Sequence, residues 1–231
     1  MSILVIAVQL FALLFAITIH EASHSWAAMK KGDLTAYSMG RVTLNPLAHI
    51  DLFGTIIMPV MLVLLRMPAF GWAKPVPVNS FNLKNPRRDN LWISFAGPAA
   101  NLLAALGCLL LIILLKSLSP GVRVFLDGLY TYLVTGSSPA LAPALKPIGG
   151  LVLILFYAVL VNTYLAVFNM IPVPPLDGSG VLMGLLSPEA AYKYDKLRPY
   201  GFLIVVGLIY LGVLGFIIRP ILYVIFRLVF V

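Results

Sequence analysis

The sequence contains little charge and a single cysteine, and both scarcities restrict the class of protein. Only 10% of its 231 residues are charged, whereas 61% are hydrophobic, which is more apolar surface than a soluble domain of this length can bury. Cys108 has no partner in the chain, so intramolecular disulfides are excluded. The composition therefore predicts an integral membrane protein.

Acidic residues are also scarce. There are eight of them against sixteen lysines and arginines, which gives a formal net charge of +8. The basic residues are scattered between apolar runs and form no continuous stripe, so no nucleic-acid partner is expected. Short loops rich in lysine and arginine instead mark the cytoplasmic side of a membrane protein. The charge pattern therefore predicts the lipid bilayer as the surroundings of this chain.

Several apolar runs approach about 20 residues, the length that crosses a bilayer as a helix. The first run has no basic residue before it and is too long for a signal peptide, so a permanent helix is expected there. The pattern predicts an all-α polytopic membrane protein, a single domain over residues 1–231, with about five to six membrane-embedded helices. Pro220 is expected to end or kink the fifth run. The runs are Ile3–Met29, Leu52–Leu65, Leu91–Leu115, Ile148–Met170, Phe202–Ile218 and Ile221–Val231.

Loop charges predict how the chain alternates across the membrane. The residues after the first run and the stretch 68–90 are both basic, so both are expected in the cytoplasm. The run between them must then leave the cytoplasmic side and return. Because Pro68, Pro75 and Pro77 prevent a regular helix on the return, we expect a short re-entrant or extended element between the second and third helices, beside a cavity. The segment 116–147 is expected outside, with a short amphipathic helix.

Two histidines and a glutamate stand near the end of the first apolar run, in the order HExxH. His20 and His24 are four residues apart, so on a helix they lie on one face and can bind one zinc ion. Glu21 points about a quarter turn away, where it can act as a general base toward water. A polar cluster that joins helices, or a proton relay in a transporter, would also place ionisable groups in the membrane, but neither requires this order and spacing.

A catalytic zinc ion needs a third protein ligand and an open position. Asp177 is the best candidate, because it follows the run Ile148–Met170, which the alternation returns to the cytoplasmic side at the depth of the histidines. Prolines before Asp177 hold the chain extended, and glycines after it allow a close approach. The alternative is a linker in which Asp177 caps a short helix over residues 178–186.

Three motifs together resemble the site-2 protease family of intramembrane zinc metalloproteases. They are HEASH at residues 20–24, GPAAN at residues 97–101 and NMIPVPPLDG at residues 169–178. The resemblance covers the three-span core and therefore most of the chain. The stretches 41–55 and 71–79 look like a compact bacterial branch of that family, without PDZ or CBS domains.

The resemblance also implies roles for individual residues. It implies one zinc ion per chain, bound by His20, His24 and Asp177, with Glu21 as the catalytic base. It further implies that Asn169 assists near the substrate or the transition state. These assignments agree with the ligand set that spacing and topology favour.

Two further polar residues are candidates for a supporting role. His49 has two possible uses. It could orient a ligand or stabilise an oxyanion, or it could be a structural hydrogen-bonding residue. The structural use is the commoner one for a lone histidine near a helix start. Asn101 can bond across helices or face the site. Small neighbours at Gly97, Ala99 and Ala100 favour close packing as its use.

The predicted function is zinc-dependent hydrolysis of peptide bonds in or near transmembrane segments of membrane-protein substrates. The expected location is a prokaryotic cytoplasmic membrane, with the active site toward the cytoplasm. Since a helical substrate hides its carbonyl groups in hydrogen bonds, it must partly unwind. Residues 70–79 are a candidate surface for the unwound segment, which would pair with them as an added strand.

The alternative function is that of a polytopic transporter or channel whose histidine and aspartate residues carry protons or metal ions. The two functions differ in the role of Glu21. Metal transit would tolerate Glu21→Gln, whereas a protease would keep its zinc and lose cleavage.

Overall fold

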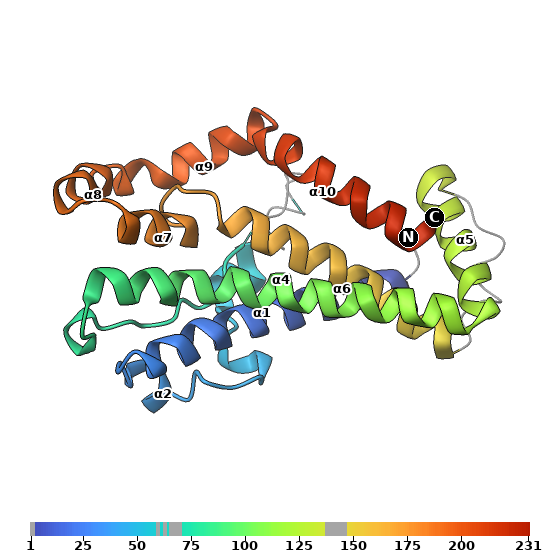
Figure 1. Cartoon of the computed structure of the whole chain (residues 1–231), viewed down its shortest axis with the longest axis horizontal. Helices are drawn as coiled ribbons and strands as arrows, with labels where there is room; N and C mark the ends of the chain where they lie inside the picture. Colours follow the sequence, from blue (N-terminus) through green and yellow to red (C-terminus); the bar gives the residue numbers. More distant parts are fainter. Residues whose placement is uncertain (1–2, 59–60, 62–63, 65–70, 137–146) are drawn as a thin grey trace.

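The computed structural model describes residues 3–58, 61, 64, 71–136 and 147–231, and within them the chain is helical without strands (Figure 1). The long elements are α1 (Ile3–Lys30), α4 (Pro86–Leu118), α5 (Pro120–Thr135), α6 (Pro147–Asn169), α9 (Gly201–Tyr210) and α10 (Val213–Phe230). The short ones are α2 (Thr35–Ser38), η1 (Pro46–Ala48), η2 (Leu52–Ile57), η3 (Ser80–Asn82), α7 (Asp177–Leu185), α8 (Pro188–Asp195) and η4 (Arg198–Tyr200).

Four helices in the described part of the chain are long and apolar enough to cross a membrane: α1, α4, α6 and α10. The all-α membrane fold is therefore confirmed, and α5 lies where the sequence predicted a further helix within residues 116–147. Three of the four helices coincide with predicted runs. The predicted return of the chain through Pro68 and Phe70 lies outside the described residues, as does most of the second run beyond Met58.

The C-terminal part differs from the prediction. The run Phe202–Ile218 is not one helix, because Gly212 adopts a left-handed conformation with φ of 72° and separates α9 from α10. The boundary expected at Pro220 therefore lies eight residues earlier, since 220 − 212 = 8. Pro220 lies inside α10, which continues to Phe230 and includes the segment whose placement the sequence left open.

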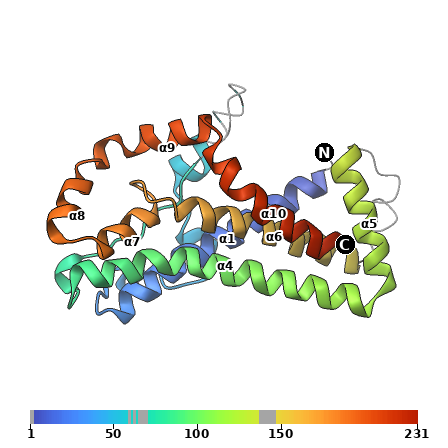
Figure 2. The same cartoon turned by 45° about the horizontal axis from the view of Figure 1, so that its top comes forward.

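The three helices α1, α4 and α6 pack side by side and form the centre of the molecule (Figures 1 and 2). The largest apolar cluster joins the first half of α1 to the second half of α4, so these two helices are antiparallel. Phe156 of α6 is fully buried in this cluster, where α5 and α10 cover it. In a bilayer such packing stabilises through close contact rather than through loss of water. The polar residues gather at the other end of the bundle.

Helix α7 lies along the beginning of α4 (Figure 2). Gly180 and Gly184 face α4 so closely that a Cβ atom at either position would overlap Ser94 or Leu91. Small residues four apart permit this approach of two helix backbones. The packing fixes the start of α7, and α7 begins at Asp177 itself, preceded by Leu176 without a side-chain cap. The alternative in which Asp177 caps a helix is therefore wrong.

Residues 71–79 form neither helix nor strand, in agreement with the expected effect of the prolines. Hydrogen bonds attach this segment to the chain that follows α2. The Trp72 amide donates to the Gly54 carbonyl at 3.2 Å, and the Lys74 amide donates to the His49 carbonyl at 2.9 Å. The segment is therefore held along one side.

Asp33, in the turn between α1 and α2, forms hydrogen bonds to both the start of α2 and the end of the segment 71–79. Its Oδ1 accepts hydrogen bonds from the Thr35 hydroxyl at 2.6 Å and amide at 3.1 Å, and from Asn82 Nδ2 at 2.8 Å. Its Oδ2 accepts from the Asn79 amide at 2.7 Å. The side chain is fully buried. One carboxylate thus joins the end of α1 to the segment 71–79.

Asp33→Asn is expected to destabilise the protein by about 2 kcal/mol at pH 7, because an amide cannot accept all four hydrogen bonds. Burial alone would raise the pKa of Asp33, but these hydrogen bonds outweigh it and lower the pKa below 3.8. A lowered folded-state pKa stabilises above the unfolded value, and the contribution is lost as pH falls through the folded value. Thermal unfolding in detergent measures the change. Asp195→Asn, at an exposed pair with Arg198, should shift the melting temperature little; an equal shift would contradict the prediction.

Candidate metal centre

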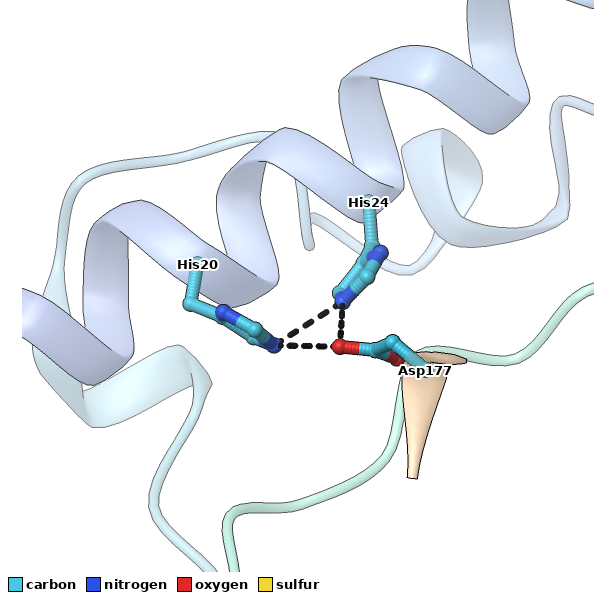
Figure 3. Close-up of side chains that lie close together, drawn as sticks. All are labelled: His20, His24 and Asp177. Carbon is cyan, nitrogen blue, oxygen red and sulfur yellow. Dashed lines mark hydrogen bonds and ion pairs between the residues drawn. The ribbon is translucent and has the colours of Figure 1, made fainter. Parts of the chain in front are cut away.

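The structure brings together the three residues that the sequence selected as metal ligands (Figure 3). His20 Nε2 and His24 Nε2 lie 3.0 Å apart, and they lie 3.0 Å and 3.3 Å from Asp177 Oδ2. Both imidazoles are buried, 6% and 7% exposed. One helical turn places the two histidines, and the packing of α7 on α4 places the aspartate.

The hydrogen bonds of the two imidazoles show whether this group suits a cation. His20 Nδ1 lies 2.5 Å from Asn101 Oδ1, and His24 Nδ1 lies 2.7 Å from the Ile93 carbonyl oxygen. Both partners are acceptors, so each Nδ1 carries the proton, and each neutral imidazole then presents its Nε2 lone pair. Two lone pairs therefore meet Asp177 Oδ2, a buried oxygen without a hydrogen-bond partner. Such a set is repulsive unless a cation lies within it, and two imidazoles with one carboxylate suit catalytic zinc.

The carboxyl of Asp177 is in the ionisation state that a ligand requires. Burial alone would raise its pKa, but hydrogen bonds and positive charge from protonated His20 and His24 outweigh burial and lower the pKa to about 2; where both rings are neutral, a bound cation would stabilise the carboxylate in their place. The group is therefore charged at neutral pH.

Glu21 lies half-buried on the neighbouring face of α1, as its position in HExxH predicts. Its charge acts on Arg41, which is only 3% exposed. Burial lowers the pKa of the Arg41 guanidinium, and the charge of Glu21 opposes that shift. Nη2 of Arg41 donates to the Lys74 carbonyl, whereas Nε and Nη1 have no hydrogen-bond partner in the described part of the chain. Arg41 thus links the surroundings of Glu21 to the segment 71–79.

Arg41 was not among the candidate residues of the sequence analysis. The signal that could have found it is its isolation, because it is the single charged residue between Asp33 and Asp51. An isolated charge in a stretch that packs against a membrane helix requires a partner or a function.

Two of the three remaining candidates are placed differently from the ligands. His49 is 1% exposed and bonds through Nε2 to the Thr43 carbonyl at 2.9 Å, within its own loop. Asn169 lies at the end of α6 and donates from Nδ2 to the Leu165 carbonyl at 3.0 Å. The hydrogen bonds described for these two side chains thus lead to backbone carbonyls near them in the chain. Nδ1 of His49 is buried and has no hydrogen-bond partner in the described part of the chain, so both readings of His49 stay predictions, as does a catalytic role for Asn169.

Asn101 does more than pack. Although it is fully buried among small residues, its side chain bonds to His20. It also bonds to Asn162 of α6, which sequence reasoning missed. An amide in the middle of an apolar run is the signal that could have found Asn162.

A cluster of two buried histidines and an aspartate within a polytopic membrane fold is the arrangement of a membrane-embedded metal site. The profile of Peptidase family M50 matches residues 8–211, and the chain belongs to this family, the site-2 protease family. The resemblance seen in the sequence is thereby confirmed.

Two relatives agree with this assignment. The chain is 34% identical to "Putative zinc metalloprotease YwhC" of Bacillus subtilis (strain 168) over 195 residues. This aligned region covers 83% of this chain and 75% of the relative. It is 30% identical to "Putative zinc metalloprotease Rip2" of Mycolicibacterium smegmatis (strain ATCC 700084 / mc(2)155) over 196 residues. This aligned region covers 85% of this chain and 64% of the relative. No solved structure gives a significant match.

Proposed function

We propose that the protein is an intramembrane zinc metalloendopeptidase that cleaves membrane-spanning proteins in or near their transmembrane segments. One zinc ion per chain is held by His20, His24 and Asp177. The observation that carries the proposal is the buried convergence of two Nε2 lone pairs on Asp177 Oδ2, next to Glu21. Family membership favours this function over the transporter or channel alternative.

In this mechanism, peptide cleavage is the addition of water to the carbonyl carbon. Zinc, when bound, supplies Lewis acidity that lowers the pKa of water and polarises a carbonyl group. Glu21 accepts a proton from the attacking water and donates it to the leaving nitrogen, so that a carbon–oxygen bond forms and the carbon–nitrogen bond breaks. Asn101 and the Ile93 carbonyl hold the two imidazoles by their Nδ1 atoms. Asn169, where α6 ends, is proposed to hydrogen-bond the substrate near the transition state.

The substrate helix is proposed to unwind first, and the unwound substrate then to pair with the segment 71–79. Trp72 and Lys74 direct their amides to one side, where they are already bonded. Ala73, between them, directs its amide to the opposite side if the segment is extended. Among the described residues this amide has no hydrogen-bond partner, so it could donate to a substrate carbonyl. Arg41 holds the Lys74 carbonyl and so fixes this segment near Glu21.

Ala73→Pro is expected to lower kcat/KM about tenfold, because it removes one amide donor from the proposed pairing edge. The residue before a proline prefers an extended conformation, so the segment itself should tolerate the change. The measurement is cleavage of a purified single-span substrate, with zinc content as the control. Unchanged cleavage would exclude pairing at this edge.

The whole chain, residues 1–231, is proposed to act as one domain in a prokaryotic cytoplasmic membrane, with its site toward the cytoplasm. Positive charge on both sides of the site supports this orientation. Lys30 and Lys31 follow the HExxH motif, and Lys193, Lys196 and Arg198 follow α7.

The proposed function is tested with purified protein and a generic single-span substrate. We expect about one zinc ion per chain, cleavage that a chelator abolishes, and recovery when zinc is added back. Zinc binding without cleavage of any membrane substrate would favour the transporter alternative. A native protein that binds no zinc would disprove the metal site.

A further inference from the structure

Asn162 is a fully buried amide in the interior of α6, a helix that contains none of the three ligands. A polar group at membrane depth is costly unless its hydrogen bonds are satisfied. Both ends of this amide are satisfied. Nδ2 donates to the Ala158 carbonyl of α6 at 2.8 Å, and Oδ1 accepts from Asn101 Nδ2 of α4 at 2.7 Å. The bond to Ala158 fixes which end of Asn162 faces α4.

Asn101 is held in one orientation by two acceptors. Its Nδ2 donates to Asn162 Oδ1 and, at 3.0 Å, to the Ala16 carbonyl of α1. If this amide were flipped, its oxygen would face both of these oxygens, and two buried hydrogen bonds would be lost. Asn101 Oδ1 therefore faces His20, where it can only accept.

The consequence for His20 concerns its tautomer. An acceptor 2.5 Å from Nδ1 requires the proton on Nδ1 and leaves the lone pair on Nε2. The opposite tautomer would direct an N–H toward His24 and Asp177 and could not bind a metal ion. The hydrogen bonds thus run in one direction, from His20 through Asn101 and Asn162 to the Ala158 carbonyl, and they connect α1, α4 and α6.

We propose that Asn162 is a positioning residue for the zinc site, which fixes the amide of Asn101 and through it the tautomer and orientation of His20. This inference rests on the proposed metal site. Groups that bond directly to a metal-binding histidine typically change metal affinity by about 10- to 100-fold when removed. Asn162 acts one hydrogen bond further out, and the Ala16 carbonyl still holds Asn101 in its absence. We therefore expect a change of about tenfold.

Asn162→Leu tests the proposal, because leucine has a similar shape and cannot accept a hydrogen bond. Zinc affinity is measured by competition with a chelator, which does not depend on cleavage. We expect about tenfold weaker binding. The matched control is Thr163→Val: Thr163 is the next residue of α6, is 2% exposed, and donates to the Val159 carbonyl of its own helix at 2.7 Å. This variant should bind zinc as the native protein does.

A double-mutant cycle separates positioning from simple helix packing. If Asn162 acts through Asn101, then Asn162→Leu should weaken zinc binding little in a chain that already carries Asn101→Ala. The same tenfold loss in both backgrounds would show that Asn162 only stabilises the fold and would overturn the proposal. Native affinity in Asn162→Leu would overturn it as well.

The tautomer itself can be measured without zinc. In metal-free native protein labelled with ¹⁵N-histidine, NMR should find the proton of His20 on Nδ1. A proton on Nε2 with none on Nδ1 would overturn the inference even if Asn162→Leu failed to fold. Because this measurement needs no metal, its failure is distinct from failure of the native protein to bind zinc, which would disprove the proposed function.

Discussion

Glu21→Gln is expected to leave about one zinc ion bound per chain and to lower cleavage by about 10²- to 10⁴-fold. General acid–base catalysis contributes about 10²- to 10⁴-fold, and a glutamine cannot take part in proton transfer. Glu21 lies on a different face of α1 from His20 and His24, so the metal ligands should not change. Metal analysis and a cleavage assay on the same preparation measure both quantities.

The chain contains only one other glutamate, which provides a matched control. Glu189 is exposed in α8, so Glu189→Gln should keep both zinc and activity. Loss of zinc in Glu21→Gln would identify Glu21 as a ligand rather than a base. Retained cleavage would require a different base.

The site was more predictable from sequence than its surroundings, for a physical reason. That His20 and His24 lie on the same face of one helix follows from helix periodicity alone. The depth of Asp177 follows from loop charges and the alternation of spans. Both depend on properties of one segment at a time, which a single sequence contains.

The hydrogen-bonded chain through Asn101 and Asn162 could not be predicted in the same way. It depends on the rotation of three helices about their axes, which contacts between helices determine. Packing among small residues and a bond to His20 were both compatible with the sequence around Asn101, and the structure contains both. The break at Gly212 was missed for a related reason: Pro220 is the stronger helix breaker in general, but the backbone turns where a glycine adopts positive φ.

Gly97 connects packing to metal chemistry, because it is where α4 passes the two imidazoles. A Cβ atom at this position would lie 2.7 Å from His24 Cε1 and 2.8 Å from His20 Cε1, and closer still to His24 Nε2. Carbon atoms that are not bonded to each other normally approach only to about 3.5 Å. The absence of a side chain at Gly97 therefore provides the space for the metal ligands.

Gly97→Ala is expected to weaken zinc binding by about 10- to 100-fold, the free-energy equivalent of about 1–3 kcal/mol of overpacking. Alanine is otherwise favoured over glycine in a helix by about 1 kcal/mol, so α4 itself should not be weakened. Gly107→Ala on the same helix is the matched control, since a Cβ atom there meets no atom within 4 Å, and it should bind zinc normally. Zinc affinity and melting temperature are measured for both variants. If Gly97→Ala bound zinc as tightly as Gly107→Ala, the imidazoles could move away from α4 without loss, and the positions of His20 and His24 would not depend on this close contact. If it lost zinc but stayed folded, the defect would be opposite to that of Glu21→Gln, which keeps the metal and loses the proton transfer.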